Sequence, residues 1–341
     1  MNTNPIREAV FQSWRLHVVA TACRLGIFSH LAQRAQTADE LAQKVACVPH
    51  MLGALLDACV GCGLLVRSGN GYRASHLSCA YLVPGRPLYL GHVIEMQARG
   101  ASRWALLTEA VQHGRVPEVD DSVGEQAPLF TLAMNDLGAH DEAFALASAV
   151  DLSGAHTLLD IGCGSGLYAI ELCRHNPDLT ALLVDREDVL KTTRELVAAS
   201  GLEARIGLRA GDMTAGPLAL TADAVLLSDA LYYDAATTRE VLASVHGMLT
   251  PGGRLIIRGY YPDAGGGESA FGALFRLQLL LSDPTRNPPT RSDLLRWLEA
   301  AGFANARAYA LTERSTCFEA QRGESEPGPR AHRRAPATVN R

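Results

Sequence analysis

The sequence has little charge of either sign and no long apolar run. Charged residues make up 20% of 341 positions, and 31 Lys and Arg residues against 36 Asp and Glu residues give a formal net charge of −5. Binding to a polyanion such as DNA depends on basic side chains, so this balance argues against it. The longest apolar stretches, such as 273–281, are interrupted by Arg276 and Gln278, whereas a membrane span needs about 18 consecutive apolar residues. The N-terminal segment MNTNPIREAV also lacks the apolar core of a signal peptide.

Cysteine is present, but without the pattern of a disulfide framework or a zinc site. Most of the 8 cysteines lie in apolar periodic stretches, which is typical of buried free thiols in a cytoplasmic protein. Cys59 and Cys62 form a CxxC pair, but no second CxxC or His pair accompanies it, and zinc needs four ligands in one place. We therefore expect a cytoplasmic protein with no bound metal and with neither nucleic acid nor membrane as a partner.

Length and composition predict two domains and a tail. Hydrophobic residues make up 48% of the chain, which is ample for packed cores, and about 150 residues per domain divides 341 into roughly 2.3 domains. We expect one domain over 1–100, a helical connector over 101–150, and a second domain over 151–322. The remaining segment, 323–341, is rich in Pro, Gly and Arg and is predicted to be disordered.

Residues 1–100 follow the order of a winged helix. Helical patterns over 6–25, from Ile27, over 40–45 and over 50–62 precede a hairpin signal around Gly69 to Gly71. In a DNA-binding winged helix, the third helix carries basic and amide side chains to phosphates and bases. Here that helix, HMLGALLDACVGC, has no Lys or Arg and contains Asp57. We therefore expect this domain to dimerise and to close a pocket, not to bind DNA.

The second half of the chain alternates between strand and helix patterns. Strands are predicted over 157–161, 181–185, 206–210, 224–229 and 254–260, with helices over 167–175, 188–199, 236–249 and 291–301. This order predicts an α/β fold with a Rossmann-like, doubly wound, mostly parallel sheet. An edge hairpin over 306–311 and 316–322 completes seven strands. Upstream, 104–113 and 130–150 are predicted helices around a polar loop over 114–128.

The most informative segment is LLDIGCGSGLYAIEL, residues 158–172. A buried strand ends at Asp160 and Ile161, and Gly162, Gly164 and Gly166 then turn the chain into a helix. Glycines at such a turn let the backbone approach a ligand and expose N–H groups at the helix N-terminus. The spacing is GxGxG. The strict dinucleotide pattern GxGxxG would need a glycine where Leu167 stands, which argues against NAD.

Two further acidic positions follow strands of the same predicted sheet. Asp185 ends the second strand, where a carboxylate can accept hydrogen bonds from both hydroxyls of a ribose. Asp212 and Met213 follow the third strand, where the acid can accept an adenine amino group and the Met side chain can pack on the ring. The pattern predicts that a nucleoside lies across the carboxyl ends of these strands.

These residues together resemble the class I S-adenosylmethionine-dependent methyltransferases. LLDIGCGSG, the strand-end Asp185, GDM and the later LTPGGRLII carry the resemblance. The winged-helix N-terminus, the FTLAM segment (Phe130 to Met134) and the element order are similar to the hydroxyindole, caffeate and carotenoid (hydroxyneurosporene-like) O-methyltransferases over residues 10–320. The resemblance implies a homodimer with interlocking N-terminal helices and a small-molecule acceptor. By this resemblance, 1–100 is the dimerisation domain, 101–150 contributes to the substrate pocket, and 151–322 is the cofactor-binding domain. It implies S-adenosylmethionine as cofactor, held by a set that we assign as follows: Asp160, Gly162, Gly164, Gly166, Asp185, Arg186, Asp212, Met213 and Ser228.

The chain departs from that family at its catalytic positions. In the family, a His after the fourth strand acts as general base; Tyr232 stands there in this sequence. One supporting carboxylate is replaced by Gly259, and the segment of the other reads Arg286 to Thr290. Ser228 stands where a lysine is often found. The family's base-and-orienter set therefore cannot be transferred to this chain.

Several reactions stay open. O-methylation in specialised metabolism follows the family, whereas S-, N- or C-methylation, for example of a thioether, follows from the missing base. Tyrosine has a reference pKa near 10, so Tyr232 and Tyr233 are predicted to orient the acceptor rather than deprotonate it. A non-catalytic, cofactor-binding regulator is a third possibility.

An alternative base is His92, on a helix predicted to line the acceptor pocket. His92, Glu95, Met96 and Arg99 share one face of that helix by spacing, and the simpler interpretation of Glu95 and Arg99 is an ion pair. We assign the acceptor pocket to one set of side chains: His92, Met96, Phe130 and Met134.

Overall fold

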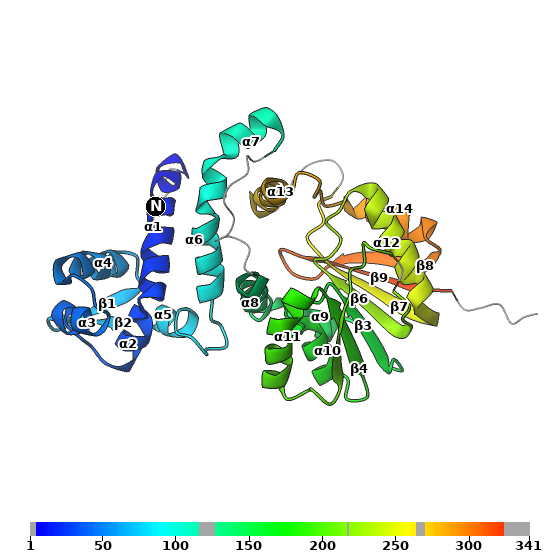
Figure 1. Ribbon diagram of the computed structural model, residues 1–341, viewed down its shortest axis with the longest axis horizontal. Coiled ribbons are helices and arrows are strands. Elements are labelled where there is room, and N and C mark those ends of the chain that lie inside the picture. The colour runs from blue at the N-terminus through cyan, green and yellow to red at the C-terminus, as the bar shows by residue number, and fades with distance from the viewer. Residues whose placement is uncertain (1–4, 116–126, 217, 264–269, 324–341) are drawn as a thin grey trace, which may run out of the picture.

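The structure is a computed structural model that describes residues 5–115, 127–216, 218–263 and 270–323. Figure 1 shows an N-terminal helical lobe and a C-terminal lobe built on a sheet, with long helices between them. The elements of the N-terminal lobe are α1 (Pro5–Arg24), α2 (Ile27–Gln33), α3 (Ala38–Lys44), α4 (Pro49–Gly61), β1 (Leu65–Ser68), β2 (Gly71–Ala74) and α5 (His76–Tyr81). This order confirms the predicted helices and hairpin; α5 was not predicted.

Local sequence signals explain the N-terminal lobe. Thr37 and Glu40 form a capping box at the start of α3, each side chain accepting the other's backbone N–H. Gly69, at φ 60°, turns β1 into the antiparallel β2. The apolar faces of the helices bury Phe28, Leu41 and their neighbours in one core. The lobe therefore has its own hydrophobic core, separate from the sheet.

The connecting helices are α6 (Gly91–Ala105), α7 (Leu107–His113), α8 (Ala127–Gly138) and α9 (Glu142–Ala149). The prediction of one helix over 130–150 was wrong, because α8 ends at Gly138 and α9 starts at Glu142. At Gly138 the chain packs so closely on α10 that a Cβ would lie 2.9 Å from Leu167 Cδ2. Residues 116–126 of the predicted loop and 324–341 of the predicted tail lie outside the described residues.

The C-terminal lobe contains a seven-stranded sheet in the order β5-β4-β3-β6-β7-β9-β8. The strands are β3 (Thr157–Ile161), β4 (Thr180–Asp185), β5 (Ile206–Ala210), β6 (Ala222–Ser228), β7 (Leu249–Gly259), β8 (Phe303–Ala310) and β9 (Thr316–Arg322). β3 to β7 pair in parallel, while β9 pairs antiparallel with both β7 and β8. The predicted mostly parallel sheet and its edge hairpin are both confirmed.

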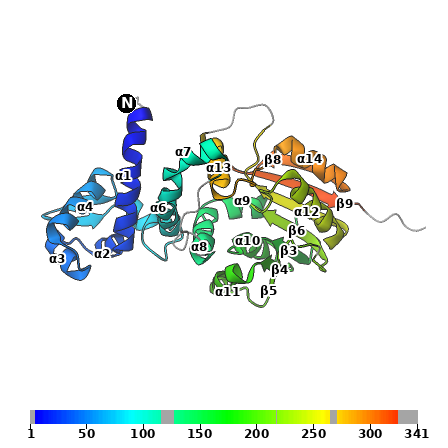
Figure 2. The same cartoon turned by 45° about the horizontal axis from the view of Figure 1, so that its top comes forward.

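Helices cover both faces of the sheet (Figure 1). One core joins the sheet to α9, α10 (Leu167–His175) and α11 (Glu187–Ser200). The other joins it to α12 (Ala235–Met248) and α14 (Arg291–Ala300). Another helix, α13 (Ala270–Ser282), lies beside the connecting helices (Figure 2), and Trp104 Nε1 of α6 donates to Gln278 Oε1 of α13 at 2.7 Å. This contact ties the two lobes together above the carboxyl ends of the strands.

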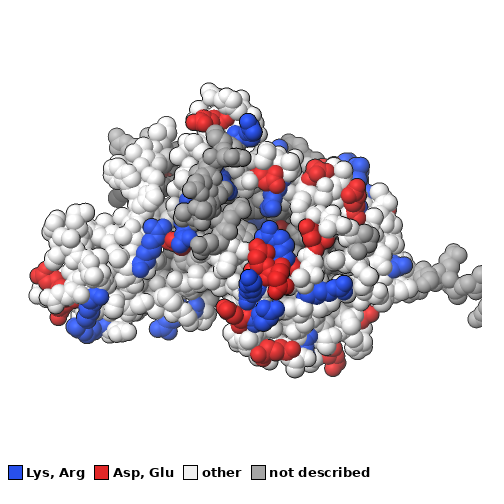
Figure 3. Space-filling model, viewed as in Figure 1, with Lys and Arg blue, Asp and Glu red and all other residues white. Residues whose placement is uncertain are grey.

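The surface carries mixed charge. On the face in Figure 3, acidic and basic side chains are interspersed over the C-terminal lobe. Among the described residues, no single helix has the length and apolar composition to cross a membrane, although α3 and α4, bent by 113° at their junction, pass that test as a pair.

Candidate active site

The glycine loop joins β3 to α10 at the carboxyl edge of the sheet. Gly162, Gly164 and Gly166 have φ values of 73°, 52° and 75°, in the left-handed region that favours glycine. A Cβ on Gly166 would also lie 2.5 Å from Leu183 Cδ2. The predicted tight turn is thus formed, and it leads directly into the N-terminus of α10.

Asp185, the last residue of β4, holds this loop in place. Its Oδ2 accepts the N–H of Gly164 at 2.8 Å, and its Oδ1 accepts the N–H of Arg186 at 2.8 Å. Burial raises the pKa of Asp185 despite these two hydrogen bonds, which lower it. Each carboxylate oxygen keeps a lone pair for a further donor, such as a ribose hydroxyl.

The remaining nucleoside-side residues gather at the same edge. Met213 Cε lies 3.2 Å from the point where a Cβ on Gly162 would stand, so the Met213 side chain reaches the glycine loop. Asp212 is fixed by Thr214, whose N–H and hydroxyl both donate to Asp212 Oδ1. Tyr233 is half-buried, and burial raises its pKa; the charge of Arg286 opposes this rise, whereas the charges of Asp212 and Asp185 add to it. Tyr233 is therefore close to the nucleoside side of the site.

Asp160 is an unpartnered acid beneath the loop. Its side chain is 1% exposed, and Oδ1 has no hydrogen-bond partner. Burial first, and then the charge of Asp185, raise the pKa of Asp160 to about 8. A buried acceptor without a donor fits a ligand that brings a positive charge or N–H groups, as S-adenosylmethionine does.

A cluster of four aromatic side chains lies on the other side of the carboxyl edge of the sheet. We call this cluster the aromatic wall; its members are Tyr232, Tyr260, Phe271 and Phe275. Phe275 lies at 5.5 Å from Tyr232 and 5.7 Å from Tyr260, between ring centroids and in edge-to-face geometry. Phe271 stacks on Phe275 at 5.9 Å. Phe271 and Leu274 expose one face of α13, whereas Leu279 and Leu281 are buried. The helix is thus a roof with one free apolar face, which its composition alone did not reveal.

Tyr232 is enclosed within the protein. Its hydroxyl donates to Asp229 Oδ1 and accepts the N–H of Tyr260 at 2.9 Å, and the residue is 6% exposed. Burial, followed by the negative charge of Asp229, raises the pKa of Tyr232 well above its ordinary value. The only proton of this hydroxyl is already donated, so the predicted contact between Tyr232 and the acceptor does not match this geometry. The hydroxyl of Tyr232 instead orients the Asp229 carboxylate through this hydrogen bond.

A buried ionic network lies behind Tyr232, and the sequence reasoning missed it. Arg258 of β7 pairs with Asp229 and, at 2.6 Å, with Glu142 Oε2 of α9. Ser315 and Thr312 also donate to the Glu142 carboxylate, at 2.5 and 2.7 Å. A signal was present: Arg258 interrupts an apolar strand, and a buried charge requires a partner.

The predicted acceptor-pocket residues lie on α6 and α8. His92 Nδ1 is 3.0 Å from Asp136 Oδ2, which also accepts the His92 backbone N–H. Phe130 is exposed, and Met96 and Met134 are half-buried. Glu95 pairs with Arg99 at 2.6 Å, which confirms the predicted i,i+4 ion pair. The carboxylate of Asp136 therefore orients the His92 ring. This pair lies where α6 packs against α8.

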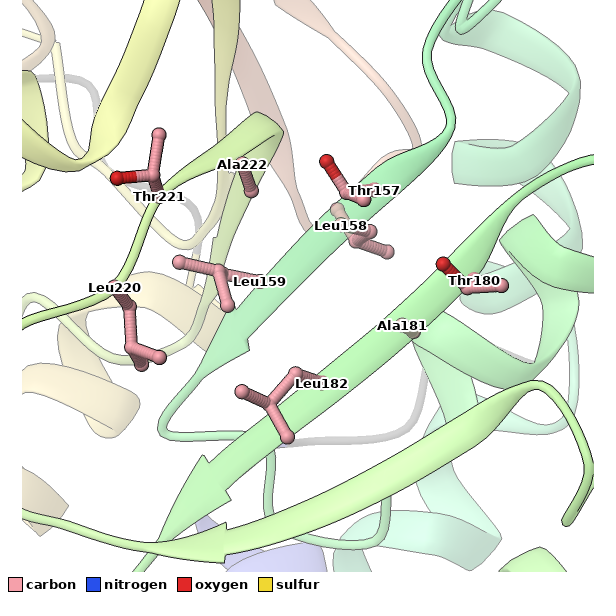
Figure 4. A pocket seen from close by; sticks show the side chains of 9 residues that line it. All are labelled: Thr157, Leu158, Leu159, Thr180, Ala181, Leu182, Leu220, Thr221 and Ala222. Atoms are coloured by element: carbon pink, nitrogen blue, oxygen red, sulfur yellow. The ribbon is translucent and has the colours of Figure 1, made fainter.

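A cavity of about 170 Å³ lies at the opposite end of the strands. Figure 4 shows side chains at the start of β3 and β4, including Thr157 and Thr180, around it. Ligands of doubly wound sheets bind outside the carboxyl ends of the strands, where the glycine loop and Asp185 lie. We therefore do not assign this cavity to the cofactor or the acceptor.

The fold and the loop define a class of protein, the S-adenosylmethionine-dependent methyltransferases. Within that class the chain belongs to the O-methyltransferase family: the model of the O-methyltransferase domain matches residues 104–304, and that of the O-methyltransferase dimerisation domain matches 8–84. The chain is thus an enzyme of S-adenosylmethionine-dependent methyl transfer, and its dimerisation domain supports a homodimer.

Relatives with given activities include O- and N-methyltransferases. The chain is 34% identical to a 3-hydroxy-5-methyl-1-naphthoate 3-O-methyltransferase of Streptomyces sahachiroi, over 86% of this chain and 87% of that protein. It is 32% identical to the N,N-dimethyltransferase OxyT of Streptomyces rimosus, over 74% and 76%. The crystal structure of human N-acetylserotonin methyltransferase in complex with S-adenosylmethionine has a TM-score of 0.82 at 23% identity, over 93% and 96%, which shows the shared fold.

Proposed function

We propose that the chain methylates a hydroxyl group of a small aromatic molecule in specialised metabolism. The observation that carries this proposal is the aromatic wall at the carboxyl edge, next to the glycine loop. Its exposed face on Phe271 and Leu274 suits a flat aromatic acceptor, because aromatic rings favour stacked and edge-to-face contacts. Two relatives support an aromatic hydroxyl as acceptor: the naphthoate 3-O-methyltransferase at 34% identity, and an 8-O-methyl transferase of tetracenomycin polyketide synthesis from Streptomyces glaucescens at 29% identity.

The cofactor supplies an activated methyl group on its sulfonium. The assigned set from Asp160 to Ser228 orients it: the glycine loop lets the backbone approach the cofactor closely, Asp185 accepts ribose hydroxyls, and Met213 packs on the adenine. Asp160 offers its unpaired oxygen to donors at the methionyl end. We also assign Tyr233 to the nucleoside side, from the charges that act on it. Methyl transfer gains mainly from proximity, orientation and exclusion of water, which α13 provides as a roof.

A second candidate is methylation of an acceptor that needs no base, such as an amine or a thioether. The observation that favours it is the enclosed Tyr232 hydroxyl, which leaves the expected base position without a proton acceptor. The 32% identity to an N,N-dimethyltransferase supports the amine.

A competitive assay distinguishes the two. The enzyme is incubated with S-adenosylmethionine and matched acceptors on one ring system: 3-hydroxy-1-naphthoate, 3-amino-1-naphthoate and 3-methylthio-1-naphthoate. We expect mass spectrometry to detect methylation of the hydroxy compound. Methylation of the amine or thioether alone would refute the proposal and favour the second candidate.

We also propose the domain boundaries, the absence of a bound metal and the cellular location of the protein. We place domain boundaries near residues 100, 150 and 322, expect no bound metal, and expect a cytoplasmic location because all eight cysteines are free thiols.

A further inference from the structure

We propose that Asp229 touches the acceptor and takes the proton of its hydroxyl group. The inference rests on the proposed O-methylation and assigns its base to a residue that neither the spacing nor the family pattern predicted.

Asp229 stands between the two halves of the site. It follows the last residue of β6, and the next residue, Ala230, lies against the glycine loop, 3.1 Å from the point where a Cβ on Gly162 would stand. On its other side, Oδ1 accepts the hydroxyl of Tyr232, which belongs to the aromatic wall. The Asp229 side chain is 41% exposed. It therefore presents a carboxylate where a methyl donor in the loop and an acceptor on the wall would meet.

The backbone and the neighbouring strand are arranged around this side chain. Asp229 has a φ of 52°, a left-handed conformation that costs energy for a residue with a Cβ and is frequent at functional sites. The N–H of Asp229 donates to Arg258 O at 2.7 Å, which holds the turn. A Cβ on Gly259 would lie 2.7 Å from the Tyr232 hydroxyl and 3.2 Å from Asp229 Oδ1. The carboxylate and the hydroxyl thus fill the space that a side chain at 259 would occupy.

Two fixed donors orient the carboxylate without using up its capacity. Tyr232 donates to Oδ1 and Arg258 to Oδ2. A carboxylate has about four lone-pair sites, so about two remain for a substrate. The charged and titratable groups behind it are Arg258 from β7, Glu142 from α9, Tyr168 from α10 and Tyr232. Arg258 keeps the carboxylate in one orientation, and Glu142 balances the second side of the guanidinium.

The proposed step transfers one proton to Asp229 and one methyl group to the acceptor. The acceptor O–H bond breaks and its proton passes to Asp229, while the oxygen's electron pair forms the bond to the methyl carbon. The electrons of the sulfur–methyl bond stay on sulfur, so the donor product is neutral. The carboxylic acid then releases its proton to water through its exposed side, and Tyr232 acts as a positioning residue.

The test compares Asp229→Asn with the wild type on two acceptors, 3-hydroxy-1-naphthoate and its 4-nitro derivative, whose hydroxyl is largely ionised at mildly alkaline pH. A general base contributes about 100-fold or more, so we expect kcat on the first acceptor to fall by at least that factor. On the nitro compound, which needs no base, we expect a loss below about 10-fold. The Kd for S-adenosylmethionine should be unchanged.

Asp151→Asn is the matched control, because Asp151 is exposed and pairs with Arg254 at the other end of β7. Its activity should equal that of the wild type. Tyr232→Phe is a second variant in case Asp229→Asn folds poorly. It should lose less than about 10-fold, more on the parent acceptor than on the nitro compound.

Equal losses on both acceptors, in Asp229→Asn or in Tyr232→Phe, would overturn the proposal, as would loss of cofactor binding in Asp229→Asn. A selective loss in His92→Asn instead would move the base to α6 and leave O-methylation intact. A wild-type enzyme that methylates neither hydroxynaphthoate but does methylate the amine would refute the proposed function and this inference together.

Discussion

At the scale of single residues, Asp160, which we propose to face the cofactor, also bears on stability. It is buried with an unpartnered oxygen, and burial raises its pKa from an ordinary 3.8 to about 8 in the folded chain. Because the folded pKa is the higher one, the folded state holds a proton that the unfolded state has lost between these pH values. Stability of the free enzyme should therefore fall as pH rises from about 4 to about 8 through this group.

We predict that Asp160→Asn removes this dependence. Compared with the wild type, the free variant should gain melting temperature as pH rises from 6 to 8, while its affinity for S-adenosylmethionine falls. Differential scanning fluorimetry with and without the cofactor measures both effects. Parallel pH curves for the two proteins would contradict the assigned burial of Asp160.

Asp185 gives the second prediction at this scale. Asp185→Ala removes the carboxylate that holds the Gly164 N–H and that is assigned to the ribose. Affinity for S-adenosylmethionine should fall by about 10-fold or more, because hydrogen bonds to a charged group contribute about 1.5–3 kcal/mol. Asp178 is exposed and precedes the start of β4, so Asp178→Ala is the control variant in the calorimetric measurement of affinity. Unchanged affinity in Asp185→Ala would remove this residue from the cofactor site.

At the scale of elements, the Glu142 carboxylate joins α9 to β7 and to the turn between β8 and β9. It accepts hydrogen bonds from Arg258, Ser315 and Thr312 in a buried position. Burial works to raise the pKa of Glu142, but Arg258 and the two hydroxyls hold it below its ordinary value. The stabilisation is therefore present above the unfolded pKa and is lost as pH falls through the folded one.

We predict that Glu142→Gln lowers the free energy of unfolding by about 3 kcal/mol at neutral pH, because Arg258 loses one buried partner. The difference from the wild type should shrink in acid. Glu171→Gln, in a more exposed pair with Arg174, should change stability by less than about 1 kcal/mol. Denaturant titrations that give the two variants equal stability would show that the network adds nothing.

The elements also show which parts of the fold could be predicted. The buried strands contain short apolar runs, such as Leu158 with Leu159 in β3 and Leu255 to Ile257 in β7, and the GxGxG turn has few possible conformations, so the sequence was sufficient to locate them. The predicted start of β7 at residue 254 was late, because the strand begins at Leu249. The break between α8 and α9 depends on contact of Gly138 with α10, which no local pattern encodes.

The same reason explains the part of the site that was missed. Asp229, Arg258 and Glu142 are far apart in sequence, and their pairing depends on which strands and helices are neighbours. The enclosure of the Tyr232 hydroxyl depends on the missing side chain of Gly259 on the adjacent strand. The residues that we assign to the cofactor could be proposed from the sequence alone because they lie at or just after the ends of strands β3 to β6.

At the scale of the whole molecule, α1 carries an apolar surface that fits the dimerisation domain. Ile6, Val10, Phe11 and Trp14 are exposed large hydrophobic residues of α1. Large apolar patches exposed on one chain typically mark a protein interface.

We predict that the double variant Val10→Glu with Trp14→Glu sediments as a monomer, because burying two carboxylates in an apolar interface is costly. The wild type should sediment as a dimer. Phe144→Glu, an exposed aromatic site on α9 outside the matched dimerisation domain, is the control and should stay dimeric. A dimeric double variant would place the interface elsewhere.

The central claim is that the enzyme transfers the methyl group of S-adenosylmethionine to an aromatic hydroxyl. The most direct measurement uses cofactor with an isotope-labelled methyl group, 3-hydroxy-1-naphthoate as acceptor, and carbon NMR of the product. We predict a labelled aryl methyl ether at position 3. A label on nitrogen, sulfur or ring carbon in parallel incubations, with none on this oxygen, would contradict the claim.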